Sequence, residues 1–232
     1  DGIRDIGVTG VQTCALPICI TANGTQTYTG STLLTPTVTC SSGGTVSNVK
    51  YAGSSTLPTD AGTYAVTADC AATGSYAAVT QGSAGNFVIN KATPTLAVSN
   101  TPQTYSGSPI AATVTCSGGG TVSNVLYSTS STVPSAAGTY AITADCASSA
   151  NYNAVTGASA GNFVISAATP TLSITNPTLT YTGTLVAANV TWSSSGTVSN
   201  VKYNTSSTVP TSAGTYAVTA DCAATGSYAA VT

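Results

Sequence analysis

Residues 62–71, with the sequence GTYAVTADCA, decide the fold because this segment recurs twice at a spacing of 76 residues. The second copy is GTYAITADCA at 138–147, and the third is GTYAVTADCA at 214–223. One face of the first copy carries apolar or small residues, namely Tyr64, Val66, Ala68 and Cys70. Alternation with period two is typical of a β-strand that buries one face. The recurrence therefore predicts several copies of one β-rich domain.

Shorter motifs recur around this segment and indicate where each repeat begins and ends. TVSNV begins at residues 45, 121 and 197, GNFVI lies at 85–89 and 161–165, and TPTL lies at 93–96 and 169–172. We therefore expect repeat 1 at 19–90, repeat 2 at 91–166 and repeat 3 at 167–232. Repeat 1 begins without TPTL and repeat 3 stops before GNFVI, so the chain is expected to be an internal piece of a longer array.

Turn residues separate the alternating runs within each repeat. In repeat 1 these turns are expected at 29–30, 41–44, 58–62 and 82–85. The spacing leaves room for about six or seven short strands per repeat and shows no amphipathic helix. We expect an all-β fold of small antiparallel β-sandwiches in tandem, because parallel strands would need crossover segments that this spacing does not hold.

Several motifs resemble a known group of proteins. TYTGS at 27–31, TYSGS at 104–108, the AGTYAVTAD segments and GNFVINKATPTL at 85–96 resemble the MBG-type and bacterial Ig-like repeats of large bacterial surface proteins and adhesins. The resemblance covers nearly all of 19–232. It implies extracellular, β-rich spacer domains without catalytic residues. Members of the group are Ig-like sandwiches or β-grasp-like folds, and the lack of a helix pattern favours the Ig-like sandwich over the β-grasp alternative.

Two cysteine pairs recur with the same spacing. Cys40 and Cys70 lie 30 residues apart, as do Cys116 and Cys146, and each pair occupies inward positions on two different strands. A disulfide in each of these repeats would stabilise the fold and would indicate an oxidising compartment. The alternative is that the four residues are buried free thiols that act as small hydrophobic side chains.

Repeat 3 breaks this cysteine pattern. Trp192 stands 76 residues after Cys116, so Cys222 lacks the partner that the spacing gives to the other pairs. A Trp at this position fits a core site, and we expect Trp192 to pack over Cys222 as an unpaired core position. Cys19 is also expected to be unpaired, because the sequence assigns it no equivalent in the other repeats.

The low charge of the chain excludes several classes of partner. Charged residues make up 4% of the chain, against about 25% in ordinary soluble domains. The formal net charge is -2, so no basic surface is expected for nucleic acid or for an anionic membrane. No run of about 20 apolar residues occurs, so no membrane span is expected in this piece.

The sequence offers little for chemistry. It contains no histidine, which excludes Ser–His and Cys–His pairs. Each repeat has one recurrent acid, which is Asp69, Asp145 or Asp221. Glycoside hydrolysis needs a pair of carboxylates, and a calcium ion needs roughly six to eight oxygen ligands. We therefore expect no enzyme activity, no catalytic residues, no metal site and no cofactor.

Twelve tyrosines fall into four sets that recur in every repeat. The sets are Tyr28, Tyr105 and Tyr181; Tyr51, Tyr127 and Tyr203; Tyr64, Tyr140 and Tyr216; and Tyr76, Tyr152 and Tyr228. Tyr51 and Tyr64 alternate with core residues, so packing is a better interpretation than a sugar-binding platform. Tyr64 and its equivalents are expected to form a tyrosine corner, in which the hydroxyl bonds to nearby backbone.

Residues 1–18, DGIRDIGVTGVQTCALPI, need an explanation different from that of the repeats. DGIRD and VTGVQTCALPI are translations of parts of a common short-read sequencing adapter, and the two residues between them fit a sample index. We interpret this segment as adapter-derived and expect it to pack against nothing.

The organisation of the chain favours a structural role. We expect spacer or stalk repeats of a bacterial cell-surface or secreted adhesin-like protein, whose partners are the neighbouring repeats of the same chain. Pro94 and Pro170 restrict the backbone in the short junctions between repeats. The alternative is a module that binds a carbohydrate or a host protein through its loops. Loop differences such as 72–74 against 148–150 are small and contain no aromatic residue, which favours the spacer.

Overall fold

The computed structural model describes residues 18–31 and 33–232, which form strands, turns and loops and contain no helix. Accordingly, these residues include no helix that could cross a membrane. The chain forms two compact units. Unit 1 comprises the described residues up to Pro94 with Ser117–Thr121 and Cys146–Val155, and unit 2 comprises Thr95–Cys116, Val122–Asp145 and Thr156–Thr232. Repeat 1 therefore lies in unit 1, repeat 3 lies in unit 2, and repeat 2 contributes to both.

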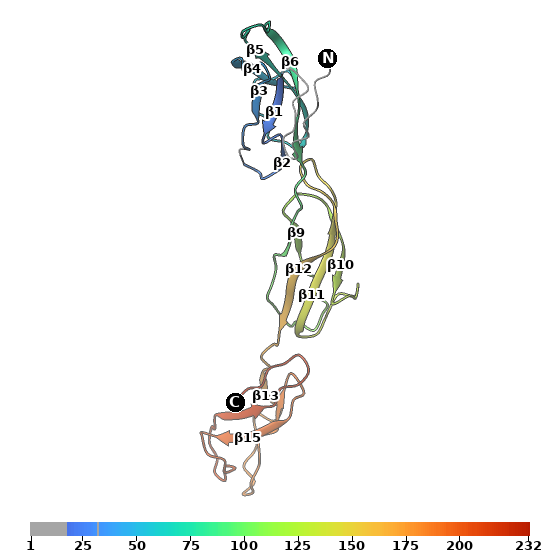
Figure 1. The fold of residues 1–232 in the computed structure, drawn as a ribbon. Coiled ribbons are helices and arrows are strands. Elements are labelled where there is room, and N and C mark those ends of the chain that lie inside the picture. The colour runs from blue at the N-terminus through green and yellow to red at the C-terminus, as the bar shows by residue number, and fades with distance from the viewer. Residues whose placement is uncertain (1–17, 32) are drawn as a thin grey trace, which may run out of the picture. The chain divides into compact units, whose positions relative to one another are not determined.

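Repeat 1 is a two-layered β-sandwich (Figure 1). Its strands are β1 (Ile18–Ala22), β2 (Thr25–Thr27), β3 (Thr37–Cys40), β4 (Val46–Tyr51), β5 (Gly62–Cys70) and β6 (Val79–Asn90). One sheet pairs β1 with β3, and the other has the order β2, β6, β5, β4. The all-β sandwich expected from the sequence is confirmed.

One strand pair departs from the expected antiparallel arrangement. β2 runs parallel to β6, with Thr25 opposite Val88 and Thr27 opposite Asn90. Parallel neighbours need a long connection. Here the segment that contains β3, β4 and β5 provides it, so the rest of the domain takes the place of a separate crossover. The prediction of a purely antiparallel fold is therefore wrong at this edge.

The core lies between the two sheets and follows the alternation of the sequence. Val66, Ala68 and Cys70 of β5 are buried, and the residues between them are less so. Phe87 of β6 and Ile18 of β1 are completely buried and belong to opposite sheets. Burying a large apolar side chain contributes about 1.5–3 kcal/mol. A few such residues therefore provide much of the stability of a domain this small.

β6 is continuous over 12 residues, so the turn expected at 82–85 is wrong. The register with β5 shifts there, because one extra residue, Ala84, has no partner on the facing strand. Such an insertion is a β-bulge. The next residue, Gly85, has a φ of 96°, in the region that favours glycine. The glycines that resemble a turn in the sequence therefore belong to a bulge inside a strand.

Repeat 2 has the same topology as repeat 1. Its strands are β7 (Leu96–Val98), β8 (Gln103–Thr104), β9 (Val114–Cys116), β10 (Val122–Tyr127), β11 (Gly138–Cys146) and β12 (Val155–Ser166). One sheet pairs β7 with β9, and the other has the order β10, β11, β12, β8. β12 runs parallel to β8, as β6 does to β2, so the departure from an antiparallel fold recurs.

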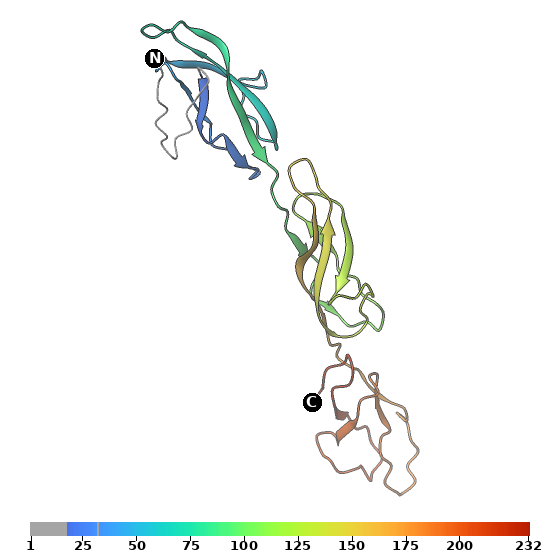
Figure 2. The ribbon, with the colours of Figure 1, turned by 45° about the vertical axis from the view of Figure 1, so that its right-hand side comes forward.

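Repeat 3 forms fewer strands within the described residues. They are β13 (Leu172–Ile174), β14 (Val190–Trp192), β15 (Val198–Tyr203) and β16 (Val218–Cys222). β13 pairs with β14 and β15 pairs with β16, so each sheet has two strands. Figure 2 shows how little of this repeat, in orange to red, is drawn as strand arrows. None of its described strands takes the place of β6 or β12.

Ile18 tests one residue of the expected adapter segment, whose residues 1–17 lie outside the described part of the chain. Ile18 is completely buried in β1 and lies opposite Cys40. Leu96 takes the same place in repeat 2, opposite Cys116. The expectation that the whole segment packs against nothing is therefore wrong at Ile18, because a large apolar side chain there completes the first strand of the core.

Candidate functional site

A disulfide joins the two sheets of repeat 1 at Cys40 of β3 and Cys70 of β5. Their Cα atoms lie 6.0 Å apart, within the normal range for disulfides. Cys116 and Cys146 of repeat 2 are each disulfide-bonded as well, and so is Cys19. The expectation that Cys19 is unpaired is therefore wrong. The repeat pattern could not place this residue, which the structure holds in β1.

Packing takes the place of the cross-link in repeat 3. Trp192 of β14 and Cys222 of β16 are buried in one cluster with Ala220. Cys222 is a free thiol, and Nε1 of Trp192 donates a hydrogen bond to the carbonyl oxygen of Asp221 at 3.3 Å. A buried indole usually needs such a polar partner. The Trp192 ring therefore connects the two sheets of repeat 3 by contact instead of by a covalent bond.

The recurrent aspartates brace the edge of the larger sheet. Oδ1 of Asp69 accepts hydrogen bonds from the backbone N and from Nε2 of Gln81, at 2.7 and 3.0 Å. Oδ2 accepts one from Nδ2 of Asn48 at 3.1 Å. The bond from the Gln81 backbone contributes most to a pKa of Asp69 below its usual value, followed by the two side-chain bonds. Three neighbouring segments, β4, β5 and β6, are tied together in this way.

Asp145 makes the equivalent brace in repeat 2. It accepts hydrogen bonds from Nδ2 of Asn124 and from the backbone N of Gly157. The first of these contributes most to a lowered pKa of Asp145. Each carboxylate is thus occupied by neutral donors of its own repeat. Among residues 18–31 and 33–232, no three metal-ligating side chains come together.

The third tyrosine set forms the corner that the sequence predicts. The hydroxyl of Tyr64 donates to the carbonyl oxygen of Asp60 at 2.9 Å. Tyr140 and Tyr216 make the same bond to the residue four positions upstream, at 2.9 and 3.0 Å. Gly62 allows this geometry, because an added Cβ would lie 3.1 Å from the Tyr64 hydroxyl oxygen. The tyrosine corner is confirmed in all three repeats, and these rings are occupied structurally.

The second tyrosine set packs against a phenylalanine in only two of the repeats. Tyr51 meets Phe87 edge to face with ring centres 5.9 Å apart, and Tyr127 meets Phe163 in the same way at 6.3 Å. Phe87 and Phe163 come from β6 and β12. Within the described residues, no phenylalanine faces Tyr203 of repeat 3, which is the equivalent of Tyr51 and Tyr127.

A loop at 149–153 contacts the end of repeat 1 inside unit 1. Tyr152 and Ala92 form a parallel β-bridge, in which the backbone N of Ala92 donates to the Asn151 oxygen at 2.9 Å. Oδ1 of Asn151 accepts from the backbone N of Ala61 at 2.7 Å, and its Nδ2 donates to Oδ1 of Asp60 at 2.9 Å. We call this contact the inter-repeat clasp.

The same clasp recurs inside unit 2, between repeats 2 and 3. Ala168 and Tyr228 form the parallel bridge, and Oγ of Ser227 accepts from the backbone N of Ala137 at 2.8 Å. In both clasps two tyrosines meet edge to face, with ring centres 5.4 Å apart for Tyr28–Tyr152 and 5.3 Å apart for Tyr105–Tyr228. Sequence reasoning missed this role of the fourth tyrosine set, whose recurrence in a loop of small residues was the available signal.

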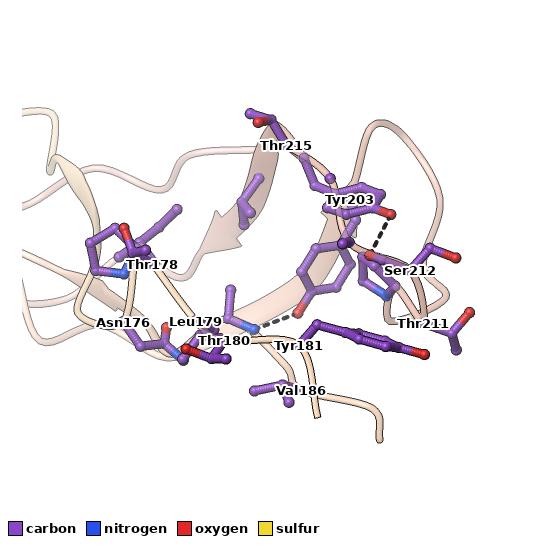
Figure 3. Close-up of a pocket in the computed structure, with 18 of the residues that line it drawn as sticks. Asn176, Thr178, Leu179, Thr180, Tyr181, Val186, Tyr203, Thr211, Ser212 and Thr215 are labelled. Atoms are coloured by element: carbon purple, nitrogen blue, oxygen red, sulfur yellow. Dashed lines mark hydrogen bonds between the residues drawn. The ribbon is translucent and has the colours of Figure 1, made fainter. Parts of the chain in front are cut away.

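A hollow of about 400 Å³ lies within repeat 3. Leu179, Thr180 and Tyr181 lie on one side of it, and Tyr203, Ser212 and Thr215 lie on the other (Figure 3). It contains no histidine or charged side chain, so it offers neither an acid–base pair nor metal ligands. Its tyrosines are its main recognition groups.

A family model of the MBG domain matches three consecutive segments, 20–93, 94–169 and 170–230. The chain belongs to the MBG domain family. No curated protein and no solved structure matches it. Within the MBG repeats so defined, the clasp joins the first repeat to the second through Ala92 and Tyr152, and the second to the third through Ala168 and Tyr228. Each MBG repeat therefore contributes its own tyrosine-bearing loop to the end of the repeat before it.

Proposed function

We propose that these MBG repeats are structural spacers of a bacterial cell-surface or secreted, adhesin-like protein. The observation that carries this proposal is the inter-repeat clasp, which recurs at both junctions with the same backbone bridge and tyrosine pair. A spacer must keep a set angle from one repeat to the next, and a peptide link alone leaves that angle free. The clasp supplies the missing constraint.

The strength of the clasp can be estimated from its contacts. In unit 1 it contains two backbone hydrogen bonds on Ala92, a bond from Ala61 to Asn151 and the edge-to-face pair of Tyr28 and Tyr152. Hydrogen bonds of this kind contribute about 0.5–1.5 kcal/mol each, and an aromatic pair contributes a similar amount. The sum is on the order of 2–6 kcal/mol, enough to keep the junction closed for most of the time.

The cysteines support a location outside the cytoplasm. Disulfides such as Cys40–Cys70 form and persist in oxidising compartments. The surface carries few charges and many small hydroxyl residues, which is compatible with a module that makes few specific contacts of its own. Under this proposal the neighbouring repeats are the partners of each repeat, and no catalytic residue is required.

Small-angle scattering of the full chain tests the spacer role. A repeat of this size has a radius of gyration of about 11 Å, so three in a row should give a particle of roughly 90 Å or more. The double variant Asn151→Ala with Ser227→Ala loosens both clasps and should broaden the distribution of interatomic distances. A compact, nearly spherical wild-type particle would contradict the proposal.

A glycan array and a host-protein screen test the alternative of a binding module. Reproducible binding that is lost when residues of the loop at 148–150 are changed, but kept in a Tyr64→Phe variant, would favour the alternative. Tyr64→Phe is the matched control, because it removes only the corner hydroxyl and leaves the ring in place. The spacer proposal expects no such binding.

A further inference from the structure

The hollow in repeat 3 lies where the other repeats have a strand. In repeat 1, β6 lies between β2 and β5, and in repeat 2, β12 lies between β8 and β11. The equivalents of those flanking strands in repeat 3 are 179–180 and 214–218. Both flanks line the hollow, and no described residue lies between them as a strand.

The dimensions of the gap fit one strand. Neighbouring strands in a sheet lie about 4.8 Å apart, so two flanks that each bond to a central strand are about 10 Å apart. In repeats 1 and 2 this space is filled by a single segment, GNFVI at 85–89 or 161–165. The backbone groups that face such a strand, at 214–217, lie outside any strand in repeat 3.

The side chains around the gap are apolar and uncovered. Tyr203 lines the hollow without the phenylalanine that covers Tyr51 and Tyr127. Val186 is 39% exposed, whereas its equivalent in repeat 1, Leu33, is 7% exposed. Leu179 and Tyr181 of the opposite flank are exposed as well. An apolar surface of this kind is covered in each of the two repeats that have the central strand.

We propose that the hollow of repeat 3 is a strand-accepting groove that binds an extended segment of the Gly-Asn-Phe-Val-Ile type. The two complete repeats define the register. The phenylalanine lies opposite Tyr216, as Phe87 lies opposite Tyr64, and the isoleucine lies opposite Gly214, as Ile89 lies opposite Gly62. The segment runs antiparallel to 214–218 and parallel to 179–180. Backbone hydrogen bonds provide affinity, and the phenylalanine provides specificity.

A sugar is a poorer occupant of this groove. Sugar rings are recognised by open aromatic faces and by fixed polar side chains, whereas this hollow is bounded on two sides by peptide backbone with unmet strand pairing. Tyr216 and Tyr203 are also held by hydrogen bonds within repeat 3, to the Ser212 carbonyl oxygen and from the Ala188 backbone N. Their hydroxyls are therefore already engaged.

The test uses the full chain and a synthetic peptide with the sequence of 155–166, VTGASAGNFVIS. Calorimetry should show saturable binding at one site. Replacing the peptide's phenylalanine by alanine should weaken binding by about 100-fold or more, because a buried aromatic ring is lost. Hydrogen exchange should show new protection of the backbone amides at 214–217, which contact by side chains alone would not produce.

A matched pair of variants locates the site. Val186→Asp places a charge in the groove at a half-exposed position and should abolish peptide binding without unfolding the repeat. Leu185→Asp changes the neighbouring residue, which is 63% exposed and does not line the hollow, and should leave binding unchanged. Equal effects of the two variants would overturn the proposal.

Three other results would also overturn the proposal. One is the absence of peptide binding to the wild-type chain. Another is glycan binding that Val186→Asp removes while the peptide fails to compete. The third is a stable dimer in analytical ultracentrifugation whose interface blocks the groove.

Discussion

Two regions of this chain have the same sequence and different structures. Residues 61–80 and 213–232 are identical at all twenty positions. In repeat 1 the segment Gly62–Cys70 is one strand of 9 residues, whereas in repeat 3 the strand is limited to Val218–Cys222. Local propensity is the same in both, so it cannot cause the difference. The length of the strand depends on its neighbour, because β6 pairs with β5 along its whole length and 214–217 have no such partner.

The same comparison holds for burial. Val66 of repeat 1 is completely buried, while its equivalent Val218 is only half-buried and lines the hollow. A β-strand propensity measured in one context therefore does not transfer to another. The predictions below either make a complete repeat resemble repeat 3 or bring repeat 3 closer to the others.

The largest effect is expected from Phe163→Ala, which removes the aromatic side chain that β12 contributes to the core of repeat 2. The cavity should destabilise that repeat by about 3–5 kcal/mol. Urea denaturation followed by near-ultraviolet circular dichroism should show a transition at lower denaturant. Tyr76→Ala is the control, because that ring is 65% exposed and should cost little. Equal midpoints for the two variants would show that the central strand does not hold the core together.

A slightly smaller effect is expected from loss of the inter-sheet disulfide. The double variant Cys40→Ala with Cys70→Ala should destabilise repeat 1 by about 3 kcal/mol on the chain-entropy model. In repeat 3, Cys222→Ala should cost much less, because that thiol is already free and Trp192 fills the space between the sheets. Thermal unfolding measures both. The comparison fails if the Cys222 variant is as unstable as the double variant.

The converse change sharpens the comparison. Trp192→Cys places a second thiol at the position equivalent to Cys40, with Cys222 at the position equivalent to Cys70. We expect a disulfide between them after aerobic purification, seen by non-reducing peptide mapping. Its gain should be offset by the lost packing of the indole, so the net change in stability should be within about 2 kcal/mol. Free thiols at both positions would mean that the sheets of repeat 3 are spaced differently from those of repeat 1.

The clasp should respond to Asn151→Ala by about 1–2 kcal/mol, because the backbone N of Ala61 loses its acceptor. Ser227→Ala removes the equivalent acceptor of Ala137 and should have a similar effect at the other junction. Native-state hydrogen exchange at Ala61 and Ala137 reads the two junctions separately. Each variant should change only its own junction, and exchange that is unchanged in both would remove the structural basis of the spacer proposal.

The smallest effect concerns acid. The pKa of Asp69 is lowered in the fold, so the ionised carboxylate adds stability above about pH 4 that is lost as pH falls through the folded pKa. Asp69→Asn keeps an acceptor for the Gln81 backbone and should flatten this acid-side loss. Melting temperatures between pH 2 and 6 measure it, on the scale of pH units defined by the usual Asp pKa of about 3.9. An unchanged acid slope would mean that other groups cause the loss.

Residues with local causes were predictable from the sequence, and residues with distant partners were not. The alternation of Val66, Ala68 and Cys70 identified the buried face of β5, and Tyr64 identified a corner that closes over four residues. The parallel pairing of β2 and β6 depends on strands about 60 residues apart, which no local pattern encodes. Gly85 shows the same limit, because its conformation suits a turn and a bulge equally and only the facing strand decides.

The clasp was missed for a related reason. Asn151 and Tyr152 lie in a loop whose composition indicates a turn, and their partners belong to another repeat. Recurrence of the tyrosine at 76-residue spacing showed that the position matters but not what it contacts. The groove of repeat 3 could be anticipated only in part, since the sequence shows that no GNFVI follows and not that its flanks remain in place.

The Cys40–Cys70 cross-link also determines how far the chain can lengthen under tension. Its two cysteines are 30 residues apart, and an extended chain covers about 3.3–3.6 Å per residue. If a pulling force unfolds repeat 1, about 100 Å of chain remains closed behind the disulfide. Repeat 3, with Trp192 at the equivalent position and a free Cys222, has no such restriction. An array that mixes the two kinds of repeat would therefore extend in steps of two different sizes.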